Sequence, residues 1–124
     1  MVYRLLIAGS RDWEPSGLIK RDLLGLMKDL NLKPKNLLVI HGGAKGVDTT
    51  AGKVANSLGV HTACVDALWS SYGRSAGPTR NAMMLTLEPN EAFAYSKDID
   101  ASKGTLNMVT LLNSRSIPVK IISS

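Results

Sequence analysis

Short apolar runs alternate with longer amphipathic stretches along the whole chain of 124 residues. The runs have the length of strands, and the first is apolar almost throughout, as in a strand buried on both faces. The expected strands are Val2–Ala8, Leu37–Ile40, Val60–Val65, Glu91–Tyr95 and Val119–Ile122. Between them, apolar residues recur at helical spacing. The expected helices are Pro15–Asn31, Val47–Leu58, Thr79–Leu87 and Thr105–Ser114.

This alternation of strands and helices predicts an α/β fold with a parallel sheet covered by helices on both faces. Right-handed crossovers favour a Rossmann-like, doubly wound sheet of about five strands in the order 3-2-1-4-5. The chain has the length of one compact domain, residues 1–124, and contains no linker or low-complexity tract. In such a sheet, a ligand crevice is expected where the strand order reverses, at the carboxyl ends of the first and fourth strands.

Composition narrows the classes of partner. The net charge of +5 suits an anionic ligand, but the charges are scattered and aromatic residues make up only 5%, which weakens the case for a nucleic-acid binder. Cys64 is the single cysteine and lies in an apolar run, so we expect a buried structural thiol rather than a nucleophile. No apolar stretch approaches the length of a membrane span, which leads us to expect a cytoplasmic protein without a membrane partner.

A glycine-rich loop, Gly42–Gly46, joins an apolar strand to an amphipathic helix. Such a junction directs backbone N–H groups and the positive end of a helix at one point, which suits a phosphate. The loop has neither the Walker A spacing nor G-x-G-x-x-G. Asp48, in the first helical turn, either interacts with the helix dipole or binds a ribose hydroxyl. His41 is either a packing residue at the end of a strand or a base.

Similar loops follow the first and fourth strands. In the first, Ser10 offers a hydroxyl and Arg11 a guanidinium, although a plain turn with Asp12 capping a helix explains the same residues. In the other, Ser102 is a candidate N-cap, and Thr105 would present its hydroxyl near the same N–H groups. No set of residues has the spacing of a metal site or of a Ser-His-Asp triad.

The connection Asp66–Pro78 is long for a small α/β domain, and such loops are often functional. Arg80 and Asn81 are expected in the first turn of the next helix. The helix dipole disfavours a cation there, so Arg80 is easier to explain if it and the helix N-terminus bind the same anion. Arg80 belongs to no apolar stripe, so we expect it to contact ligand rather than the core. Trp69 either stacks on a base or pins the loop to the core, and the neighbouring methionines are expected in the core.

Taken together, these loops resemble the YspA-like branch of the SLOG superfamily, which is named after DNA-processing protein A and the lonely-guy phosphoribohydrolases. The resemblance covers nearly the whole chain and implies a Rossmann-like fold, a bacterial or phage-borne protein, and binding of nucleotides or nucleotide-derived signals. The motifs that carry it are Gly9-Ser10-Arg11-Asp12-Trp13, His41-Gly42-Gly43-Ala44-x-Gly46-x-Asp48, Trp69, Ala76-Gly77-Pro78-x-Arg80-Asn81-x-Met83 and Ser102-x-Gly104-Thr105.

The enzymes of the superfamily cleave an N-glycosidic bond with an Arg and a Glu. The segment that begins at Arg80 resembles their arginine element, with Asn for Lys at position 81, whereas Met108 stands where their catalytic Glu is expected. An oxocarbenium-like transition state requires a nearby carboxylate, which a thioether does not provide. The remaining candidates for catalysis are Arg80, Asp48 and Asp12.

The sequence therefore predicts a nucleotide-binding or nucleotide-sensing protein that requires no cofactor and holds no metal. A nucleotide N-glycosidase or transferase, and a DNA-binding accessory protein, are the two alternatives. The small size of the domain and the dimeric state of many SLOG relatives favour a homo-oligomer, a dimer or tetramer. The expected ligand-binding residues are Gly9, Ser10, Arg11, Asp12, His41, Gly42, Gly43, Gly46, Asp48, Trp69, Arg80, Asn81, Ser102, Gly104 and Thr105.

Overall fold

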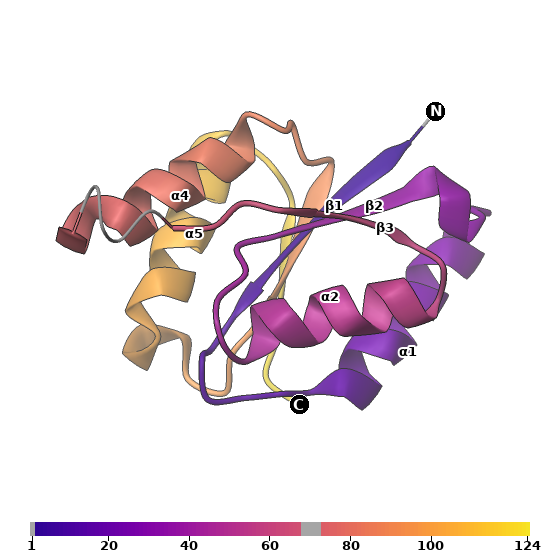
Figure 1. Cartoon of the computed structure of the whole chain (residues 1–124), viewed down its shortest axis with the longest axis horizontal. Coiled ribbons are helices and arrows are strands. Elements are labelled where there is room, and N and C mark those ends of the chain that lie inside the picture. The colour runs from indigo at the N-terminus through magenta and orange to yellow at the C-terminus, as the bar shows by residue number, and fades with distance from the viewer. Residues whose placement is uncertain (1, 68–72) are drawn as a thin grey trace.

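One parallel sheet of five strands, in the order β3-β2-β1-β4-β5, forms the centre of the molecule (Figure 1). The computed structural model describes residues 2–67 and 73–124. Both the doubly wound strand order and the α/β class predicted from the sequence are confirmed. The strands are β1 (Tyr3–Gly9), β2 (Leu37–His41), β3 (His61–Cys64), β4 (Glu91–Tyr95) and β5 (Val119–Ile122).

Helices cover both faces of the sheet, because successive side chains of a buried strand point to opposite faces. Leu5 and Ile7 of β1 pack with α1 and α2, whereas Leu6 and Ala8 pack with α4 and α5. The first strand is therefore apolar at almost every position. The helices are α1 (Ser16–Asp29), α2 (Val47–Ser57), α4 (Ala76–Leu85) and α5 (Lys103–Ser114). Short 3-10 turns lie at Pro34–Asn36, Gly73–Ser75 and Ile99–Ala101.

The strand register places the chemistry-bearing loops at one edge. Gly9 at the end of β1 pairs with Tyr95 at the end of β4, and His41 at the end of β2 pairs with Cys64. The β1 and β4 chains then leave in opposite directions, β1 toward α1 on one face and β4 toward α5 on the other. This divergence opens the sheet edge between the two strands, where the sequence predicts the ligand crevice.

Three local expectations are wrong. Cys64 is exposed rather than buried, because β3 is an edge strand. Met84 lies in the core, but Met83 beside it is 46% exposed. Helix α4 begins at Ala76 rather than Thr79, because a proline such as Pro78 is tolerated in a first turn, whose N–H groups have no partner within the helix.

Candidate functional site

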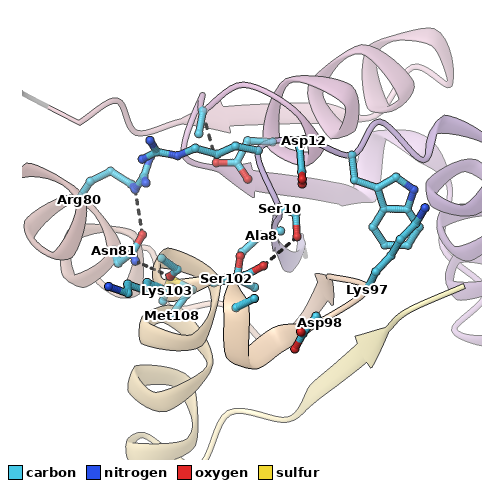
Figure 2. A pocket seen from close by; sticks show the side chains of 18 of the residues that line it. Ala8, Ser10, Asp12, Arg80, Asn81, Lys97, Asp98, Ser102, Lys103 and Met108 are labelled. Carbon is cyan, nitrogen blue, oxygen red and sulfur yellow. Dashed lines mark hydrogen bonds between the residues drawn. The ribbon is translucent and has the colours of Figure 1, made fainter.

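A cavity of about 830 Å³ opens at the diverging ends of β1 and β4 (Figure 2). Its walls come from the loop after β1, the start of α2 with the loop before it, the middle of α4, the start of α5, and the segment that follows β4. Because α4 begins at Ala76, Arg80 and Asn81 lie beyond the first turn in which the sequence predicts them. The cavity brings together ten of the expected ligand-binding residues, which are Gly9, Ser10, Arg11, Asp12, Asp48, Arg80, Asn81, Ser102, Gly104 and Thr105. These residues come from four separate segments of the chain, so the fold assembles the cavity from distant parts of the sequence.

Three serine hydroxyls form a closed ring of hydrogen bonds at the carboxyl ends of β1 and β4. The Oγ of Ser10 lies 3.1 Å from that of Ser96 and 3.0 Å from that of Ser102, and the last two are 2.9 Å apart. Ser96 is almost completely buried, and its N–H donates to the carbonyl of Ile122. The ring ties the end of β1, the end of β4 and the start of α5 to one point.

The first turn of α5 borders the cavity without a side-chain cap. Ser102 occupies the N-cap position, as expected, but its hydroxyl belongs to the serine ring and caps no backbone N–H. The N–H groups of Lys103, Gly104 and Thr105 lie at this helix start, and no acidic residue lies in the first turn. The positive end of the helix dipole therefore faces the cavity together with the exposed Lys103.

Arg80 lies in the wall between α4 and the glycine-rich loop. Its side chain is only 8% exposed, which corrects the expectation that it stands outside the packed interior. Its Nη1 donates to the carbonyl of Gly42 at 2.6 Å, and its Nε donates to Oδ1 of Asn81 at 2.9 Å. Asn81 in turn donates to the carbonyl of Gly104 and to Oδ1 of Asn107 on α5. This chain of bonds fixes the guanidinium and joins three elements of the site.

Asp48 places a buried carboxyl in the same cavity. The residue is 5% exposed, and its Oδ2 accepts a hydrogen bond from the N–H of Ala44 at 3.3 Å. Burial raises the pKa of Asp48 from 3.8 to about 6, although the charges of Arg80 and Arg11 and the bonds from backbone N–H groups pull it down. Removal from water is therefore the larger effect on this carboxyl.

The start of α2, unlike that of α5, is covered by protein. The N–H of Val47 donates to the carbonyl of Ser10 at 3.0 Å. Gly46 adopts a positive φ of 88° and packs against the backbone of Ser10 and Arg11, where any Cβ would overlap with it. The positive end of α2 is thus occupied by the loop after β1. The glycine-rich loop Gly42–Gly46, which resembles a phosphate site in sequence, therefore packs against the loop after β1. The helix start that remains open to the cavity is that of α5.

Four of the expected residues that the structure describes do not line this cavity. His41 lies beneath the glycine-rich loop, where its Nδ1 accepts the N–H of Gly43 at 3.1 Å and burial lowers its pKa. Gly42 and Gly43 line a second, neighbouring cavity of about 560 Å³. Gly46 has the packing role given above, and Trp69 lies outside the described residues.

Several residues that line the cavity are not among the ligand-binding residues expected from the sequence. The Lys97 ammonium lies 5.2 Å from the centre of the Trp13 ring, a cation–π contact at the rim of the cavity, and Asp98 follows it. Lys97 and Asp98 directly follow the end of β4, so their place at the sheet edge was available as a signal. The full set of unassigned lining residues is Ala8, Trp13, Ala44, Met84, Lys97, Asp98, Ala101, Lys103 and Met108.

Sequence comparison gives a direct relative. The Gene 61 protein of Mycobacterium phage D29 is 30% identical to this chain over 121 residues, which cover 94% of the chain and 93% of the phage protein. The chain belongs to the family of this Gene 61 protein. No family model matches it. Because the two proteins of the Gene 61 family align over nearly their full lengths, the whole domain is shared and not only a motif.

Structural comparison extends the likeness beyond the Gene 61 family. The fold matches that of DNA processing protein A from Streptococcus pneumoniae with a TM-score of 0.76, at 18% sequence identity. The match covers 99% of this chain and 51% of the other, so the chain spans about half the length of that protein. The Rossmann-like fold that the resemblance implied is therefore shared with DNA processing protein A. Separately, none of the helices in residues 2–67 and 73–124 has the length and apolar character needed to cross a membrane.

Proposed function

We propose that the protein binds a nucleotide or nucleotide derivative in the cavity between β1 and β4, as a binding or sensing protein of the YspA-like branch of SLOG proteins. The phosphate of the ligand contacts the first turn of α5, and the remainder extends toward Arg11 and Asp48. The observation that carries the proposal is the uncapped start of α5 in the wall of a cavity of about 830 Å³. Cavities of about 300–1,000 Å³ suit small ligands and cofactors.

The electrostatics of the cavity support a ligand of mixed character. Four basic side chains line it, those of Arg11, Arg80, Lys97 and Lys103. Three carboxyl groups, those of Asp12, Asp48 and Asp98, line it as well. Cations and helix N–H groups bind phosphate oxygens, whereas carboxylates accept hydrogen bonds from ribose hydroxyls or from base amino groups. A nucleotide carries all of these groups in one molecule.

One observation favours a second candidate, cleavage of the N-glycosidic bond of a nucleotide. Met108 lies at the position of the expected catalytic Glu, lines the cavity, and has no acidic group. Asp48 lies in the same cavity, and its pKa of about 6 suits a proton-transferring carboxyl near neutral pH. In this alternative, Asp48 takes the role that Met108 cannot fill.

Calorimetric titration with a panel of nucleoside monophosphates, including AMP and GMP, tests the proposal. We expect saturable binding that weakens about fivefold in Lys103→Ala, because an exposed charge contact contributes about 1 kcal/mol. Lys53→Ala is the matched control, since Lys53 is equally exposed on α2 but lines neither cavity. Binding of no nucleotide, or equal losses in the two variants, would contradict the proposal.

The same samples distinguish the alternatives. Release of free base during incubation, detected by chromatography, would identify a glycosidase, and its loss in Asp48→Asn would assign the carboxyl. Binding of single-stranded DNA with a steep dependence on salt would favour the DNA-binding alternative. A homo-oligomer, dimer or tetramer, is also part of the proposal, and sedimentation of the intact protein at micromolar concentration tests it.

A further inference from the structure

Arg80 separates two cavities and lines both of them. The second cavity, of about 560 Å³, lies beyond the guanidinium on the side of the glycine-rich loop. It shares Arg11, Ala44 and Arg80 with the first cavity. Gly42, Gly43, Lys45 and Asp66 belong to the second cavity alone. Because these three residues form part of both walls, the two cavities adjoin at Arg80.

The charge of Arg80 is buried without a direct ion pair, although the carboxyl of Asp48 attracts it within the same cavity. Within residues 2–67 and 73–124, no carboxylate lies within ion-pairing distance of the guanidinium. Its two hydrogen-bond acceptors, the carbonyl of Gly42 and the amide of Asn81, are neutral. A buried cation of this kind costs free energy unless an anion approaches it. The side chain is thus placed as a receptor for a negative group.

The unused donors of Arg80 are open to the cavities. Two hydrogen bonds engage only part of the five N–H groups of a guanidinium. Among the described residues, no buried side-chain nitrogen or oxygen lacks a partner, so Nη2, which makes neither of these bonds, is reached by solvent. Gly42 allows this geometry, since a Cβ at that position would overlap with the guanidinium.

The second cavity is more uniformly basic than the first. Among the described residues, the cations Arg11, Lys45 and Arg80 line it, and Asp66 provides the one carboxylate. In the first cavity, four cations face three carboxyl groups. The Oδ1 of Asp66 also accepts the Cys64 thiol at 3.3 Å. The charge distribution therefore favours an anionic group in the second cavity, on the side of Arg80 and Lys45.

We infer that the second cavity receives a second phosphate of the same ligand, so that the preferred ligand class is a dinucleotide or another nucleotide with two separated phosphate groups. This inference rests on the proposed function, because it places one phosphate at α5 and the other beyond Arg80. The buried guanidinium of Arg80 borders both sites, so both phosphates approach it. A mononucleotide fills only the first of them.

Calorimetric titration of the intact protein with AMP and with the linear dinucleotide pApA tests the inference. We expect pApA to bind about tenfold more tightly than AMP or better, which corresponds to about 1.4 kcal/mol. Lys45→Ala is expected to remove most of this gain and to leave AMP affinity unchanged. Asp66→Asn is expected to act in the opposite direction, because it removes the one carboxylate that repels the second phosphate. Lys53→Ala again serves as the control.

The outcomes separate this inference from the proposed function. Equal affinities for AMP and pApA would overturn the second phosphate site and leave nucleotide binding in place. Equal losses of both affinities in Lys45→Ala would overturn it as well, since Lys45 lies outside the first cavity. Binding of neither probe would overturn both proposals. Tighter binding of pApA that depends on Lys45 but not on Lys53 supports the inference.

Discussion

Replacement of Asp48 by Asn is expected to stabilise the fold at neutral pH. The ionised carboxyl is 5% exposed, and burial holds its pKa near 6 rather than 3.8. Asn has almost the same shape, and its side-chain oxygen can still accept the N–H of Ala44. The substitution therefore removes a buried charge and retains the hydrogen bond. A buried carboxyl that lowers stability is typical of groups kept for function.

The pKa shift gives the magnitude and the pH window. Each unit corresponds to about 1.4 kcal/mol, so the ionised Asp48 costs about 3 kcal/mol at pH 7. The folded state binds the proton more tightly than the unfolded state, so stability falls as pH rises from about 4 to 6. For a domain of this length, a gain of about 3 kcal/mol in the variant raises Tm by about 10 °C.

Thermal unfolding followed by circular dichroism at pH 4, 5, 6 and 7 measures this effect. Asp48→Asn should melt well above the unmodified protein at pH 7, and the difference should become small at pH 4, which lies well below the pKa of about 6 in the folded state and close to the ordinary value of 3.8. Asp100→Asn, at an exposed position, should show no such pH-dependent difference. A variant that melts at or below the unmodified protein at pH 7 would refute the reasoning.

Two further substitutions probe the framework of the site. Gly42→Ala should displace the Arg80 guanidinium and reduce both Tm and nucleotide affinity. Gly25→Ala, in open space on α1, should instead stabilise the fold by about 0.5–1 kcal/mol. Equal effects of the two substitutions would contradict this account. Tyr95→Phe removes the hydroxyl that donates to Oδ2 of Asp22 at 2.8 Å and should cost about 1.5–3 kcal/mol in urea unfolding. An unchanged urea midpoint would show that Tyr95 does not anchor α1.

The fold could be predicted because its signal repeats along the chain. Every buried strand is an apolar run of the right length, and each is followed by a helix with one apolar stripe. The strand order follows from the handedness of the crossovers and needs no knowledge of individual contacts. The errors lie where position in the sheet matters, as at Cys64 on the edge strand β3 and at Met83 on the outer side of α4.

The site was only partly predictable. The sequence of a loop shows that its residues lie at the carboxyl ends of the strands, but not which of their side chains contact one another. The glycine-rich loop appeared to present an open helix start, but the start of α2 is covered by the backbone of Ser10 and Arg11. Arg80 was expected to contact ligand rather than the core, but it is buried and donates to the carbonyl of Gly42, 38 residues away in the sequence. Contacts of this range depend on packing between elements, which no local pattern encodes.

The two ends of the described chain also leave the sheet on different sides, which has a practical consequence. β1 starts at the edge away from the cavity, and β5 ends at the cavity edge, where the carbonyl of Ile122 accepts the N–H of Ser96 in the serine ring (Figure 1). A fusion joined beyond β5 would therefore emerge from the same end of the sheet as the cavity. Attachment to a sensor surface through the segment before β1 would place the opposite end of the sheet against that surface.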